Sequence, residues 1–229
     1  MDAARYLRAK NAVDDTSFNT EVWSELRRAL KIRLLKKGVD KRADREARVA
    51  VRVVDLGAGL LNMLPRVTDL VQELTEEVGV AVELRYLAFE QSAALQADIR
   101  CALLDKGFIP SPSDDLGLAA GPQTMQLEEF CRSQDAVRVC VTLSQRDFMS
   151  AAALGDVRAA FASTTVGSVA GSMASLGLEG RSLEGSRVAV TASGPEMDLL
   201  LGCCVADLVE PSALCAQVME LAGDGGGLL

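Results

Sequence analysis

The chain has 229 residues, of which 49% are hydrophobic, 24% are charged and 4% are aromatic. This balance predicts a globular protein with an aliphatic core, and the length fits one α/β domain better than two small domains. The net charge of −8 argues against general electrostatic binding to nucleic acid or membrane lipid, although residues 27–37 are locally basic. A small-molecule substrate is therefore the expected partner.

The sequence has no histidine, and its six cysteines show no C-x-x-C spacing. We therefore expect no metal site, and Ser-His-Asp and Cys-His nucleophile systems are excluded. The sequence shows neither a secretory signal nor an apolar run of roughly 18 residues, which predicts a cytoplasmic protein without a membrane segment. Buried, reduced thiols are expected in that compartment, at Cys101, Cys131, Cys140, Cys203, Cys204 and Cys215.

Residues 1–36 are predicted to be helical, because apolar side chains recur at every fourth position. The recurring residues are Val22, Leu26, Leu30 and Leu34, with Trp23 beside them. Asp14 and Asp15 are expected to cap the start of this helix. A charged linker over residues 36–48 should follow it.

Strands and helices then alternate along the chain. Residues 49–57 are predicted to be a strand buried on both faces, and a glycine turn leads from it into a helix over residues 60–78. A second strand over residues 80–90 precedes a helix that should stop at Gly107, and a loop over 109–124 leads to a third strand over 136–143. This alternation predicts the α/β class, with a doubly wound, mostly parallel sheet and helices on both faces.

The last third of the sequence is less regular. Residues 149–180 are rich in Ala, Ser and Gly, and they are either a helix packed through small side chains or an insertion. Strands are expected over residues 187–192 and 197–209. Pro211 is expected in the first turn of a helix that runs to residue 222.

The stretch VVDLGAGLLNML, residues 53–64, carries the strongest functional signal. Gly57 and Gly59 permit a tight turn and the close approach of a ligand at the end of a strand, where parallel sheets bind their ligands. A dinucleotide turn would have a third glycine where this chain has Asn62, and a P-loop would need G-K-[ST]. Asp55 would repel a pyrophosphate but would attract a cationic ligand, such as S-adenosylmethionine.

The sequence D-L-G-A-G followed by an apolar helix resembles the first motif of class I S-adenosylmethionine-dependent methyltransferases. The resemblance implies a Rossmann-like sheet in which the turn lies against the cofactor, so that Asp55, Gly57, Ala58 and Gly59 are expected to contact it. Glu90, at the end of YLAFE, matches the acid that binds both ribose hydroxyls in that family.

The resemblance also implies roles for residues farther along the chain. Asp147 in SQRDF matches the acid that meets the adenine amino group, with Phe148 as a neighbour of the adenine, although Asp135 and the strand over 187–192 compete for that role. The backbone around Gly202 and Cys203 would pass the methyl end of the cofactor. Structural alternatives are open for Asp55 and Glu90 as caps or surface acids, and for Cys203 as core packing.

The opening YLRAKNAVDDTSFN resembles the lead-in of a group of these enzymes in which a helix closes over the cofactor. The resemblance thus implies a helical lid or cap over residues 1–48 and an S-adenosylmethionine-binding domain over residues 49–229. GDGGG near the end matches the turn before the family's fifth strand. The chain is therefore expected to be truncated after the start of that strand, as a fragment or as one part of a sheet that another element completes.

The expected function is the transfer of a methyl group from S-adenosylmethionine to an unknown small-molecule acceptor, with no protein nucleophile. Catalysis would come mainly from holding the two reactants in line. Two alternatives stay open: a non-catalytic or truncated methyltransferase-like binding protein, and an NAD(P)-dependent oxidoreductase.

Overall fold

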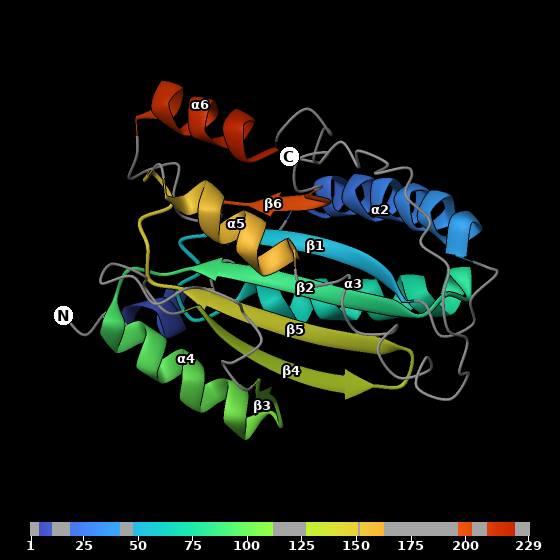
Figure 1. The fold of residues 1–229 in the computed structure, drawn as a ribbon, viewed down its shortest axis with the longest axis horizontal. Helices are drawn as coiled ribbons and strands as arrows, with labels where there is room; N and C mark the ends of the chain where they lie inside the picture. Colours follow the sequence, from blue (N-terminus) through green and yellow to red (C-terminus); the bar gives the residue numbers. More distant parts are fainter. Residues whose placement is uncertain are drawn as a thin grey trace, which may run out of the picture.

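The computed structural model describes residues 5–10, 19–41, 48–111, 127–150, 152–162, 197–202 and 210–222. Its centre is a six-stranded mixed sheet with the strand order β3-β4-β5-β2-β1-β6 (Figure 1). The strands are β1 (Val49–Leu56), β2 (Val82–Phe89), β3 (Ile109–Pro110), β4 (Glu128–Gln134), β5 (Val137–Ser144) and β6 (Leu199–Leu201).

The inner part of the sheet is parallel. β2 lies between β1 and β5, and β6 pairs with the opposite side of β1. In β1, β2 and β5 nearly every side chain is buried, because both faces of these strands are covered. The strands predicted over residues 49–57, 80–90 and 136–143 are therefore confirmed, and their carboxyl ends meet at one edge of the sheet.

The outer part of the sheet is antiparallel and was not predicted. β4 forms a hairpin with β5, and β3 pairs with the far side of β4. The prediction of a loop over residues 109–124 is therefore wrong for Ile109–Pro110, while residues 112–126 lie outside the described part of the chain. β4 escaped prediction because only Phe130 among its seven residues is buried, so the sequence lacks the alternating apolar pattern of a strand.

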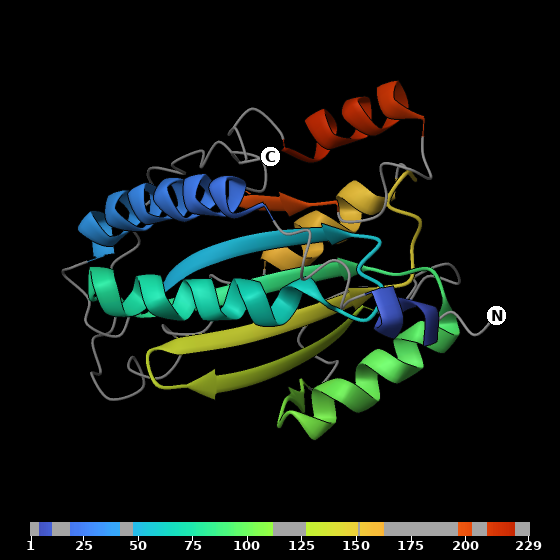
Figure 2. The same cartoon turned by 180° about the vertical axis from the view of Figure 1, so that it is seen from behind.

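Helices cover both faces of the sheet, as expected from the sequence. One face carries α2 (Thr20–Lys41), α3 (Met63–Val78) and α4 (Ala93–Asp105), and their apolar side chains share one core with the sheet. The other face carries α5 (Ala153–Ala162) and α6 (Pro211–Ala222), which pack in a second core around Val54, Leu87 and Phe89. Figures 1 and 2 show the two layers from opposite sides.

The N-terminal helical region differs in its limits from the prediction. α2 begins after Asn19, whose side-chain oxygen accepts hydrogen bonds from the backbone N–H groups of Glu21 and Val22 at 2.9 and 3.1 Å. It continues to Lys41, beyond the expected end at residue 36. The proposed caps Asp14 and Asp15 lie outside the described residues.

A buried acid joins α2 to the sheet. Asp198, with its side chain 3% exposed, accepts from Lys37 Nζ at 2.6 Å and from Arg33 at 3.4 Å. Its other oxygen accepts from the backbone N–H of Arg52 in β1 at 2.9 Å. Asp198, which directly precedes β6, thus links α2 to β1. Leu30 and Leu34 of α2 belong to the same core as β1.

The cysteines differ from the expectation of buried, reduced thiols. Cys131 and Cys140 form a disulfide between β4 and β5, and Cys101 and Cys215 are free but exposed. Cys203 and Cys204 lie outside the described residues, as do the segments 187–192, 203–209 and 223–229. α5 occupies part of the segment 149–180, and the helix predicted over 211–222 is confirmed as α6. Within the described ranges, no helix combines the length and apolar character that crossing a bilayer requires.

Candidate functional site

The turn after β1 has the backbone geometry that its glycines suggested. Gly57 and Gly59 have φ angles of 66° and 55°, values in the left-handed region that L side chains adopt with difficulty. The backbone N–H of Ala58 donates to the carbonyl of Phe89 at the end of β2, at 2.9 Å. The turn is therefore fixed against the neighbouring strand at the carboxyl edge of the sheet.

Glu90 connects this turn to the start of α4. One carboxylate oxygen accepts from the backbone N–H of Gly59 at 3.1 Å, and the other accepts from the N–H of Ser92 at 2.8 Å. Its backbone N–H donates to Ser144 at the end of β5, at 3.0 Å, and its carbonyl accepts from the Gln96 side chain at 2.9 Å. Glu90 is thus held rigidly where three strands and a helix meet.

Asp55 is buried too deeply to contact a ligand directly. Its side chain is 2% exposed and accepts a hydrogen bond from the Tyr86 hydroxyl on β2. Burial raises the pKa of Asp55 to about 7, and the charge of Glu90 contributes to the rise, whereas the bond from Tyr86 opposes it. Asp55 and Glu90 are therefore electrostatic neighbours on the same side of the molecule.

A short helical segment, residues 5–10, lies next to the glycine turn (Figure 2). A Cβ atom added at Gly59 would lie 3.4 Å from a methyl carbon of Leu7. The guanidinium of Arg8 reaches the carboxylate of Asp98 on α4 at 3.5 Å. A ligand that contacts the backbone of Gly59 from this side must therefore displace Leu7.

The other predicted site residues lie in different surroundings. Asp147 is exposed, and its carboxylate accepts from the backbone N–H of Met149 at 2.9 Å. Phe148 is 8% exposed and packs in the core of the α5 face. Gly202 is exposed just after β6, and Cys203 lies outside the described residues. The structure thus brings together Asp55, Gly57, Ala58, Gly59 and Glu90.

Two polar residues near this edge were not singled out from the sequence. Asp156 on α5 is 6% exposed and accepts from the Ser144 hydroxyl at 2.6 Å and from Arg146 at 2.9 Å. Tyr86 is the other missed residue. The contact of Tyr86 with Asp55 follows only from the register of β1 and β2, whereas that of Asp156 requires the placement of α5 against the end of β5.

One group of possible metal-binding side chains lies away from the turn. Atoms of Glu129, Cys131 and Cys140 lie within 4.8 Å of one another. The two sulfur atoms are joined as a disulfide, so neither is the thiolate that binds a metal ion.

The geometry at the turn favours some ligands over others. The Glu90 carboxylate accepts from the N–H of Gly59, and the buried carboxyl of Asp55 lies close enough to interact with the charge of Glu90. A phosphate at this position would meet negative charge, whereas a cationic or hydroxyl-bearing group would find acceptors. Comparison with known proteins adds no constraint, because no protein-family model, curated protein or solved structure matches the chain.

Proposed function

We propose that this protein is a class I S-adenosylmethionine-dependent methyltransferase that acts on a small-molecule acceptor in the cytoplasm. The observation that carries the proposal is the placement of the Glu90 carboxylate against the N–H of Gly59, with Asp55 beside it. S-adenosylmethionine has a sulfonium, an ammonium and two ribose hydroxyls but no phosphate. Its groups complement an acidic, glycine-lined site.

The sheet supports the same proposal. The parallel strands stand in the order β5-β2-β1-β6, so the chain crosses from one side of β1 to the other after β5. Ligands of doubly wound sheets bind at such a switch point, beyond the carboxyl ends of the strands. The glycine turn lies there, and we assign the Rossmann-like class on this part of the sheet.

Each residue of the turn has a defined part in the proposal. Glu90 binds the ribose hydroxyls with the acceptor capacity that its two backbone hydrogen bonds leave available. Gly57 and Gly59 let the cofactor approach the backbone, and Leu7 moves aside as it enters. Asp55, whose pKa is raised to about 7, contributes negative charge near the turn once it is deprotonated, without touching the cofactor.

The reaction itself needs little from side chains. A lone pair of the acceptor attacks the methyl carbon, the carbon–sulfur bond breaks, and its electron pair neutralises the sulfonium. The acceptor loses a proton to solvent or to a nearby base. The protein contributes by holding the acceptor atom, the carbon and the sulfur in line.

Binding of S-adenosylmethionine to the full chain, measured by titration calorimetry, tests the proposal. The variant Glu90→Ala should weaken binding more than tenfold, because two charge-assisted hydrogen bonds to ribose are lost. Glu76→Ala is the matched control, since Glu76 is an exposed acid near the far end of α3 and carries the same charge. Equal affinities of the two variants would refute the role of Glu90.

The same titration with NAD and NADP separates the oxidoreductase alternative. Tighter binding of either dinucleotide than of S-adenosylmethionine would overturn the proposal in favour of that alternative. Transfer of an isotopically labelled methyl group to small-molecule acceptors then distinguishes an enzyme from a non-catalytic binding protein, which would bind the cofactor without consuming it.

A further inference from the structure

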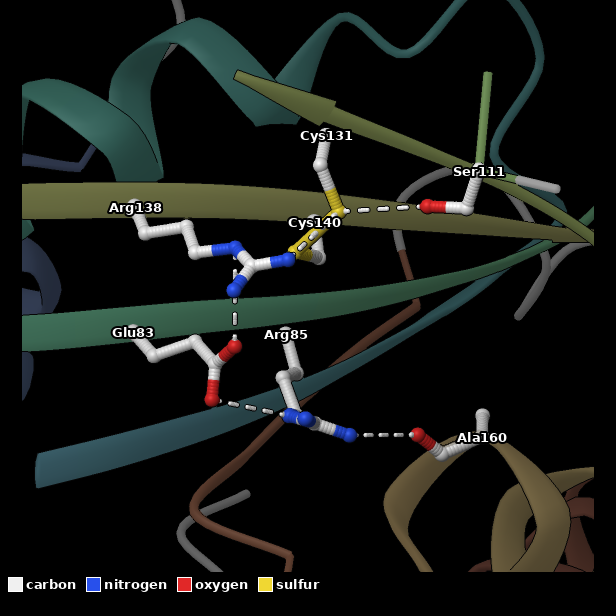
Figure 3. Close-up of a disulfide and its surroundings, with 7 residues drawn as sticks. All are labelled: Glu83, Arg85, Ser111, Cys131, Arg138, Cys140 and Ala160. Atoms are coloured by element: carbon white, nitrogen blue, oxygen red, sulfur yellow. Dashed lines mark hydrogen bonds and ion pairs between the residues drawn. A yellow bond between two sulfur atoms is a disulfide. The ribbon is translucent and has the colours of Figure 1, made fainter. Parts of the chain in front are cut away.

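We propose that Cys131 and Cys140 are a reversible thiol–disulfide pair, in which Cys131 is the thiol that reacts with peroxide and Cys140 is the thiol that resolves the product. The disulfide lies on the β4–β5 hairpin (Figure 3). Cys140 is opposite Arg85 in the register of β5 and β2, so it lies on the other face of the sheet from Tyr86. The inference is independent of the proposed function.

The backbone places the two sulfur atoms together whether or not they are bonded. Cys131 and Cys140 are directly opposite each other in the antiparallel ladder, with their Cα atoms 4.2 Å apart. They are separated by nine positions in sequence, and the hairpin already closes that short loop. A disulfide stabilises least where the loop is short, so the bond can open while the ladder persists.

The two cysteines differ in accessibility. Cys140 is 2% exposed in the middle of β5, whereas Cys131 on β4 is half-buried. A small oxidant therefore reaches the sulfur of Cys131 first. The partner thiol lies directly across the ladder, where it meets the oxidised sulfur without any rearrangement of the strands.

Hydrogen-bond donors converge on the sulfur of Cys131. An N–H of Arg138 and the hydroxyl of Ser111 each lie 3.8 Å from it (Figure 3). A guanidinium beside a sulfur stabilises the thiolate, which is the nucleophilic form. The carboxylate of Glu129, within 4.8 Å, opposes this effect, but unlike Arg138 and Ser111 it has no proton to donate to the sulfur.

Arg138 is itself held in place by buried charges. Its guanidinium lies 3.8 Å from Glu83, whose side chain is 12% exposed. Glu83 also accepts from Arg85 at 3.2 Å, and Arg85 donates to the carbonyl of Ala160 at the end of α5. Figure 3 shows these residues as one chain of contacts across β5 and β2. The ion pair with Glu83 thus orients the Arg138 guanidinium, whose side chain is 46% exposed, on the face of the sheet that carries the disulfide.

The reaction balances with a peroxide as oxidant and a dithiol as reductant. The Cys131 thiolate attacks one peroxide oxygen, the O–O bond breaks, and the leaving hydroxide takes a proton to become water. The Cys140 thiol then attacks the sulfenic sulfur of Cys131, the S–O bond breaks, and a second water leaves. A dithiol returns two electrons and two protons and restores both thiols.

The test begins with the full chain reduced by dithiothreitol, freed of reductant and kept with a chelator. Hydrogen peroxide is added, and samples are alkylated over time and mapped by mass spectrometry. The Cys131–Cys140 disulfide should form at least tenfold faster than Cys101 or Cys215 is oxidised. Those two free, exposed thiols are the internal controls. Dithiothreitol should then restore both thiols without unfolding the chain. Equal rates at all these cysteines, or unfolding on reduction, would overturn the proposal.

The order of the two cysteines is tested with a sulfenic-acid trap. In Cys140→Ser the trap should label Cys131, and excess trap in the wild-type chain should label the same residue if the variant fails to fold. Label on Cys140 instead would overturn the assignment. Arg138→Gln should slow oxidation roughly threefold, since a tenfold loss of thiolate is partly offset by the greater nucleophilicity of a more basic sulfur. An unchanged rate would exclude Arg138 as the activating group.

Discussion

Replacement of Asp55 by asparagine should alter the pH dependence of stability in a defined direction. The pKa of Asp55 is raised by burial from 3.8 to about 7 in the folded chain. Between these values the folded state binds a proton that the unfolded state has released. The contribution of Asp55 to the free energy of unfolding is therefore greatest below the lower pKa and is lost as the pH rises through the higher one. The asparagine side chain has no proton to lose, so the variant lacks this dependence.

The magnitude follows from the two pKa values. For one group with these values, the wild-type chain should lose about 2.5 kcal/mol of unfolding free energy between pH 5 and pH 8 relative to Asp55→Asn. Little discount for solvent is needed, since the Asp55 side chain is only 2% exposed. Tyr86→Phe should move the loss to higher pH, because the bond from Tyr86 holds the pKa of Asp55 down.

Urea unfolding of the wild-type chain and of Asp55→Asn, measured at pH 5, 6, 7 and 8, checks this reasoning. The difference between the two proteins cancels the titration of other groups that the substitution leaves unchanged. Parallel stability curves would refute it, because they would mean that Asp55 has the same pKa in the folded and unfolded chain.

Two further substitutions test packing and backbone geometry. Asp198→Ala should lower the unfolding free energy by about 3 kcal/mol in urea denaturation, because it leaves the partly buried cations Lys37 and Arg33 without their acid. Asp69→Ala, at an exposed acid on α3, should change it by less than about 0.5 kcal/mol. Asp135→Gly should raise the thermal midpoint slightly, with a gain of about 0.5 kcal/mol, because Asp135 has a φ angle of 51° in the hairpin turn. Asp105→Gly, at the end of a helix, should instead lower it, and a fall in both variants would contradict the role of the turn.

The sequence predicts those elements whose own residues determine their environment. β1, β2 and β5 are apolar on both faces, so their burial is evident without knowledge of their partners. Gly107, with a φ angle of 78°, ends the helical region of α4 where expected. β4 is different, because its strand conformation comes from pairing with β5 and β3 rather than from its own side chains. A pattern-based prediction cannot recover such a strand.

The candidate site divides in the same way. The glycines and Glu90 are visible in sequence because they follow strands whose ends must meet at one edge. The contact between Asp55 and Tyr86 depends on the register of β1 and β2, in which Val53 is opposite Tyr86. The disulfide likewise depends on the register of the β4–β5 hairpin. Register is set by packing across the whole sheet, which local patterns do not encode.

The acidic edge of the sheet predicts how ligand binding should depend on pH. Glu90 raises the pKa of Asp55 because both would carry negative charge, so positive charge bound at the glycine turn lowers that pKa. By linkage, a cationic ligand binds more tightly to the deprotonated site, and its affinity gains a contribution as the pH rises through 7. An anionic dinucleotide has the opposite effect on Asp55 and loses affinity over the same range. Titrations of S-adenosylmethionine and NAD at pH 6 and pH 8 should therefore change in opposite directions, and Asp55→Asn should remove the part of each change that Asp55 causes. If Asp55→Asn retains the full pH dependence of affinity for both ligands, the protonation of Asp55 is not coupled to charge bound at the glycine turn. Asp55 then affects the stability of the chain but not ligand binding.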